Sequence, residues 1–106
     1  MKKARHGSIL PAHQLIANID PTFGEAYEEL FELIMTRDRS LSVRTKELIV
    51  IGILAAKGQF SALDTHIHRA MKIGIGQKEI LEALEVSMLY GGTESMIVGG
   101  ELLAKG

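Results

Sequence analysis

Histidine and acidic side chains are the groups in this chain that could move a proton near neutral pH. His66 and His68 lie close together, in the segment DTHIHR. A His-x-His pair suggests a metal ligand set, but on a helix the two side chains point roughly 200° apart. They cannot bind one ion within a subunit, so we expect no metal site.

The two histidines differ in their helical neighbours. His68 shares its side of the helix with Asp64, one turn earlier, which predicts a solvated ion pair. His66 has small neighbours such as Ala62 and Ala70, which predicts a half-buried ring. From spacing alone, a hydrogen-bonded core histidine is the simpler interpretation of His66, and general acid–base catalysis is the functional alternative.

Glu47 is the second candidate for catalysis, because it directly precedes an apolar segment. A carboxylate near a helix N-terminus is usually a surface charge. If Glu47 points inward, burial favours its neutral form and suits it to sharing a proton with a histidine. Arg44, one turn earlier, could hold Glu47 ionised or bind a substrate carboxylate through two N–H groups.

The remaining polar candidates carry weaker signals. Tyr90 could supply a hydroxyl group to a substrate pocket, although a packed helix end is the more ordinary explanation. Lys46 and Arg69 are interpreted as surface charges. His6 and His13 lie in an N-terminal arm without pattern, and we assign them no role.

Composition excludes several classes of function. The chain has 106 residues and no cysteine, so it can hold no disulfide, thiolate nucleophile or thiolate metal site. A net charge of -1 gives no general attraction for nucleic acid or anionic membranes. The longest apolar run, residues 48–56, is too short to cross a bilayer, and no apolar segment follows the basic first residues as in a signal peptide. We expect a cytoplasmic protein that acts on a small molecule without a cofactor and binds neither nucleic acid nor membrane.

Apolar residues recur at helical spacing, and no long stretch alternates as a strand would. We predict one all-α domain over residues 1–106, a compact bundle of about five or six helices, in which residues 1–19 form an arm with room for a short helix. Capping residues and glycines predict where the helices begin and end. The predicted starts are Asp20-Pro21, Ser42, Ser61, a point after Gly76 that Glu79 supports, and Thr93. The predicted ends lie near Thr36, Lys57, Gly74 and Gly91-Gly92.

Residues 48–56 are apolar on every side of the predicted helix, so no face of it favours water. A partner subunit is the simplest cover for the surplus apolar surface, and a central helix in a monomer is the alternative. The small residues Gly52, Gly99 and Gly100 would let helices approach closely.

Several motifs resemble one protein superfamily. Residues 41–48, LSVRTKEL, are similar to the L-x-x-[KR]-x-[KR]-E-L opening of the carboxymuconolactone decarboxylase and alkylhydroperoxidase superfamily. Residues 66–74, HIHRAMKIG, followed by Glu79-Ile80, resemble its H-x-x-x-A-x-x-x-G … E-I helix, and Ile19-Asp20-Pro21 with Tyr27 resembles its N-terminal helix. The similarity runs roughly from Leu10 to Leu103. It implies an alkylhydroperoxidase-like helical bundle, commonly assembled as a homo-oligomer, a trimer or hexamer.

The resemblance separates two branches of the superfamily. In the peroxidase branch, residues equivalent to Glu47 and His66 form a proton-relay pair that activates a Cys-x-x-Cys pair, whose positions here hold Gln59 and Ala62. Without thiols, peroxidase activity by that mechanism is not expected. The decarboxylase branch uses no cysteine, but often has Glu where this chain has Ala62, which leaves the substrate open.

Our leading hypothesis is a small lyase that decarboxylates a carboxylated lactone or related keto acid. His66 would be the general acid, Glu47 would orient its ring, and Arg44 would bind an anionic group. One alternative is an alkylhydroperoxidase-related antioxidant protein that has lost its redox cysteines. The other is a non-catalytic assembly module that binds a small molecule.

Overall fold

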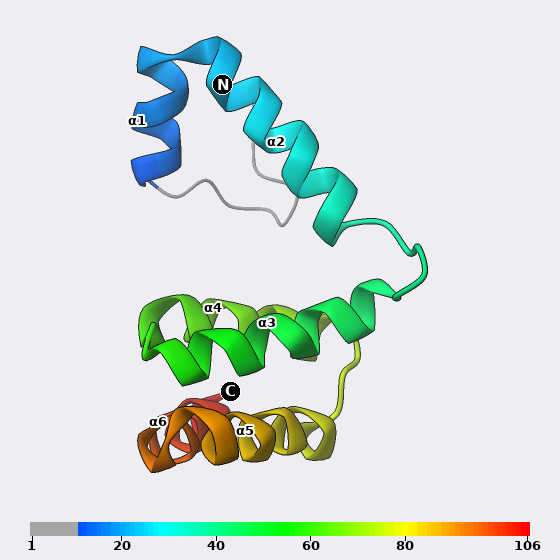
Figure 1. Cartoon of the computed structure of the whole chain (residues 1–106), viewed down its shortest axis with the longest axis vertical. Coiled ribbons are helices and arrows are strands. Elements are labelled where there is room, and N and C mark those ends of the chain that lie inside the picture. The colour runs from blue at the N-terminus through cyan, green and yellow to red at the C-terminus, as the bar shows by residue number, and fades with distance from the viewer. Residues whose placement is uncertain (1–10) are drawn as a thin grey trace. The chain divides into compact units, whose positions relative to one another are not determined.

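The computed structural model describes residues 11–106, and every regular element in that range is an α-helix. Residues 1–10, which include His6, lie outside the described part. The helices are α1 (Pro11–Ile19), α2 (Pro21–Met35), α3 (Val43–Lys57), α4 (Phe60–Lys72), α5 (Gln77–Gly91) and α6 (Thr93–Lys105) (Figure 1). They form two units, a helix pair of α1 and α2 and a four-helix unit of α3 to α6. The all-α prediction is confirmed.

In the helix pair, local sequence signals set the start of α2. The Asp20 side chain accepts a hydrogen bond from the Phe23 N–H at 3.1 Å, and Pro21 occupies the first turn. The helix ends at Met35, with Thr36 as its C-cap, so both predicted bounds are confirmed. The two helices pack tightly, because a Cβ added at Gly24 would lie 2.9 Å from the Cβ of Ala17.

The bounds of α3 also match the prediction. Its first N–H, on Val43, donates to the Asp38 carboxylate at 2.8 Å. Its end is followed by Gly58, whose φ of +73° suits glycine.

Two predicted starts differ from the structure. Helix α4 begins one residue before Ser61, because the Leu63 N–H already donates to the carbonyl of Gln59 at 3.0 Å. Thr93 is not the N-cap of α6 as predicted. That position is taken by Gly92, whose φ of +105° lets the chain turn sharply out of α5.

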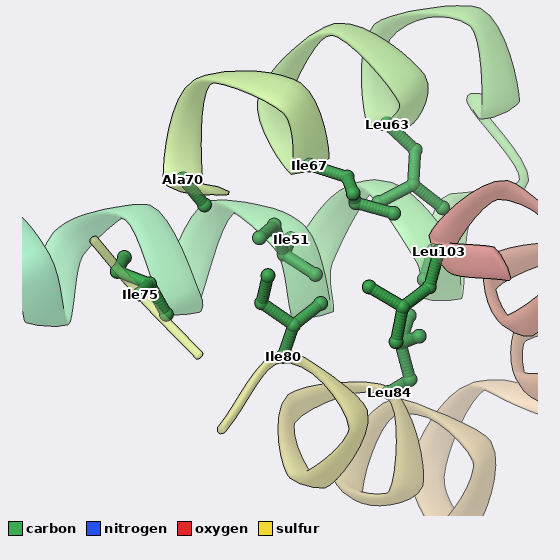
Figure 2. Close-up of a cluster of buried hydrophobic side chains, with 9 residues drawn as sticks. Ile51, Leu63, Ile67, Ala70, Ile75, Ile80, Leu84 and Leu103 are labelled. Carbon is green, nitrogen blue, oxygen red and sulfur yellow. The ribbon is translucent and has the colours of Figure 1, made fainter. Parts of the chain in front are cut away.

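The core of the four-helix unit is formed by buried residues from all four helices and from the loop between α4 and α5. Figure 2 shows side chains of α4 and α5 converging on Ile51 of α3, with Leu103 of α6 beside them. The core members are Ile51, Ala55, Leu63, Ile67, Ala70, Ile75, Ile80, Leu84 and Leu103. This core fixes α3 against α4 and thereby positions the polar groups at its edge.

The three glycines predicted to allow close packing behave differently. A Cβ at Gly99 would lie 2.5 Å from a methyl group of Leu84, so an alanine there would force the Leu84 side chain to shift where α6 packs on α5. A Cβ at Gly52 would make an ordinary 3.7 Å contact with the Ala83 carbonyl, and one at Gly100 would meet nothing within 4 Å. Only Gly99 therefore has the predicted role.

Helix α3 does not bury its whole circumference within the four-helix unit. Ile49 and Ile53 are 45% and 50% exposed, whereas Ile51 is fully buried. The partner subunit predicted to cover this helix stays a prediction. Among residues 11–106, no helix has the length and apolar character needed to span a membrane.

Candidate active site

Glu47 is the first member of the buried stripe of α3. Residues 47, 51 and 55 follow one another at four-residue spacing, which places them on one face of the helix. The core that buries Ile51 and Ala55 therefore also buries Glu47, whose exposed fraction is 0%. His66 flanks the equivalent stripe on α4, beside the fully buried Ile67.

The two helices bring a carboxylate and an imidazole together. Oε1 of Glu47 lies 2.8 Å from Nδ1 of His66, whose side chain is 16% exposed. We assign a proton to Nδ1, which donates to the carboxylate, and this leaves Nε2 as the nitrogen that can exchange a proton. Nε2 has no hydrogen-bond partner within the described chain. The ring is thus held through one nitrogen, and the other makes no hydrogen bond to the described residues.

The second carboxylate oxygen of Glu47 is unusual. Oε2 is buried and has no hydrogen-bond partner among residues 11–106. An unpaired buried carboxylate oxygen is costly, and such groups concentrate at functional sites. This observation favours the functional interpretation of Glu47 over a surface charge.

Arg69 is a third member of the site. It follows His66 by three residues on α4, and its Nη1 lies 3.4 Å from Nδ1 of His66. Because Nδ1 donates to Glu47, it cannot also accept a strong hydrogen bond, so this longer contact brings a cation close to the pair without a second full bond. Partial burial lowers the pKa of Arg69, and the negative charge of Glu47 opposes that shift.

The interpretation of Arg69 as an ordinary surface charge missed this contact. A signal was present, since residues three apart are neighbours on a helix. The burial of Glu47 likewise followed from its spacing to Ile51 and Ala55.

Arg44 is engaged elsewhere. Its guanidinium forms a two-pronged salt bridge with Glu79, in which Nε lies 3.3 Å from Oε2 and Nη2 contacts Oε1. Nη1 also lies 3.4 Å from the Gly74 carbonyl. Glu79 accepts the Gly76 N–H at 3.2 Å, and this bond and Arg44 hold the pKa of Glu79 below its usual range. Arg44 thus ties the start of α3 to the start of α5, and its predicted role in substrate binding stays a prediction.

The other candidates lie on exposed surface. Tyr90 is 86% exposed near the end of α5, so a binding role would need a further surface to enclose it. Nδ1 of His68 lies 3.3 Å from Oδ1 of Asp64, in the predicted exposed position, but its hydrogen bond is to the backbone carbonyl of Asp64 at 2.8 Å. Within the described residues, no group of three or more His, Cys, Asp or Glu side chains is arranged to hold a metal ion.

The fold and the site define an all-helical protein in which a buried carboxylate and an imidazole meet between consecutive helices. The sequence matches the carboxymuconolactone decarboxylase family over residues 21–102, and the chain belongs to this family. It is also 30% identical over 88 residues to an uncharacterized protein of Methanocaldococcus jannaschii, in a match that covers 76% of this chain and 85% of the relative. The family resemblance predicted from the motifs is confirmed.

Proposed function

We propose that this protein is a cofactor-independent lyase that decarboxylates a carboxylated lactone or a related keto acid. The observation that carries the proposal is the state of His66, whose Nδ1 is held by buried Glu47 while Nε2 has no partner within residues 11–106. Membership of the carboxymuconolactone decarboxylase family supports the same reaction class.

The chemistry requires one proton donor. When the carbon–carbon bond to the carboxylate breaks, carbon dioxide leaves and the electron pair passes into an adjacent unsaturated carbonyl system. The protonated His66 ring then delivers its Nε2 proton to carbon, and the ring takes a new proton from water before the next turnover. Glu47 stabilises the imidazolium and keeps the ring oriented.

The test is release of carbon dioxide from a panel of carboxylated unsaturated lactones and β-keto acids. We expect His66→Gln to lower the rate about 10²–10⁴-fold, the usual contribution of a general acid. His68→Gln is the matched control, because it removes an exposed histidine from the same helix, and should leave the rate unchanged. In deuterated water, the product should carry one new C–D bond, at a carbon of the enolate or dienolate that forms when carbon dioxide leaves.

Two results would reject the proposal. One is a His66→Gln variant as fast as the wild-type protein, which would remove His66 from the mechanism. The other is failure of the wild-type protein to release carbon dioxide from any member of the panel.

A further inference from the structure

We propose that Arg69, and not Arg44, binds the substrate, by holding a carboxylate that the reaction does not remove. This inference rests on the proposed function and adds the class of substrate, an acid that keeps one anionic group through the reaction. It arises because the two arginines differ in the hydrogen bonds that they already make within the four-helix unit.

The guanidinium of Arg44 has little left to offer a ligand. Glu79 already occupies it in the two-pronged arrangement that a substrate carboxylate would need, and the Gly74 carbonyl takes a further N–H group. Binding a substrate there would first require breaking that salt bridge.

The guanidinium of Arg69 is in the opposite state. Its hydrogen-bonding contact within residues 11–106 is the 3.4 Å approach of Nη1 to His66, which leaves most of its five N–H donors for a ligand. The side chain is only partly exposed, so the cation has already lost part of its hydration. A carboxylate bound there would restore the lost interactions through the fork geometry that arginine favours.

The position of Arg69 suits a molecule that reacts with His66. The two residues are neighbours on one face of α4, so an anion held by Arg69 lies beside the imidazole. The charged groups that contact His66 are Glu47 from α3 and Arg69 from its own helix, and their charges offset each other. An added carboxylate therefore favours the protonated ring, which is the form that a general acid requires.

The reaction decides which group Arg69 holds. A cation paired with the departing carboxylate would stabilise the starting material more than the transition state and would slow the release of carbon dioxide. A carboxylate that stays on the molecule is held equally before and after the bond breaks. The product should then bind Arg69 as well, which allows a test without turnover.

The test measures binding of levulinate, a keto acid with one carboxylate, to the full-length protein by calorimetry and by NMR of the His66 ring. We expect Arg69→Gln to weaken binding by about tenfold or more, with a smaller loss for Arg69→Lys, which keeps the charge but not the fork. Lys72→Gln removes one positive charge from the same helix and should bind as the wild type does. The uncharged methyl ester of levulinate should bind far more weakly. Thermal melts monitored by circular dichroism identify any variant that fails to fold.

Equal affinity in the wild-type and folded Arg69→Gln proteins would overturn the inference, as would tight binding of the ester or no binding of levulinate to the wild type. The outcome is separable from the proposed function. Levulinate binding that depends on Arg69, without carbon dioxide release from any substrate, would retain the carboxylate site and reject the lyase. Decarboxylation that Arg69→Gln leaves unchanged would retain the lyase and reject the carboxylate site.

Discussion

The contact between Glu47 and His66 makes a prediction about stability that depends on its burial. If a buried carboxylate is held by one imidazole, removing the imidazole alone should destabilise the protein strongly, whereas removing both groups should not. We consider His66→Leu, Glu47→Leu and the double variant, which replace the polar groups by apolar side chains.

The magnitudes follow from exposure and partners. His66→Leu leaves a carboxylate with 0% exposure and two unpaired oxygens, since Oε2 has no partner within the described chain. Breaking a buried pair in this way costs about 3–5 kcal/mol. We expect the lower end, about 3 kcal/mol, because the cation of Arg69 remains nearby, and this corresponds to a fall in Tm of about 12–24 °C.

Glu47→Leu should cost much less. It leaves Nδ1 of a neutral, 16% exposed ring, and Nη1 of Arg69 at 3.4 Å could then donate to that nitrogen. We expect a loss of about 1 kcal/mol or less. The double variant buries two apolar side chains in place of the pair and should have a stability within about 1 kcal/mol of the wild type. The coupling energy is then about 2–5 kcal/mol.

Urea unfolding followed by circular dichroism at neutral pH measures all four proteins of this cycle. The slope of the unfolding free energy against urea should be unchanged, so that the midpoints report stability. His68→Leu is the control, since it removes a histidine with a 56% exposed side chain. Single-variant losses that add up to the double-variant loss within about 0.5 kcal/mol would show that the two groups do not interact and would refute the geometry.

Two further predictions concern packing and pH. Gly99→Ala and Gly100→Ala gain the same helix propensity, but only Gly99→Ala places a Cβ 2.5 Å from Leu84. Gly99→Ala should therefore be about 1–3 kcal/mol less stable than Gly100→Ala in chemical unfolding. Equal stabilities of the two variants would contradict the close approach. Glu79 has a lowered pKa, so its stabilising effect is present above its ordinary value of 4.5 and is lost as the pH falls through the lowered value. Glu79→Gln should thus be less stable than the wild type at neutral pH, and melts at successively lower pH should show the difference shrinking; a difference independent of pH would exclude the salt bridge as its cause.

Helix bounds were predictable where a local signal determines them. The side chain of Asp20 caps α2 by accepting a hydrogen bond from the N–H three residues later, and Gly58 ends α3 by its backbone conformation. The start of α6 was missed because Gly92 and Thr93 are both acceptable N-caps from sequence, and the turn out of α5 selects glycine.

The site was only partly predictable for a different reason. Glu47 and His66 were selected from their residue types and helical neighbours, and the family resemblance supported them, but their contact depends on how α3 packs on α4, which no local pattern specifies. The partners of Arg44 depend in the same way on the placement of α5, so its guanidinium could not be assigned to Glu79 in advance. Arg69 is the exception, because its proximity to His66 follows from helical spacing alone.

The family resemblance and the structure together explain how a proton relay can serve a chain without cysteine. Ala62, one turn before His66 on α4, stands where the peroxidase branch has a thiol, so a methyl group replaces the thiol that the pair would activate. The carboxylate–imidazole pair nevertheless remains intact. Burying its polar groups lowers the folding stability in a way that apolar residues at the same positions would not. Under the proposed function, Nε2 of His66, which has no hydrogen-bond partner within residues 11–106, protonates a carbon of the bound substrate. The proposed decarboxylation therefore gives the pair a use that does not depend on a thiol.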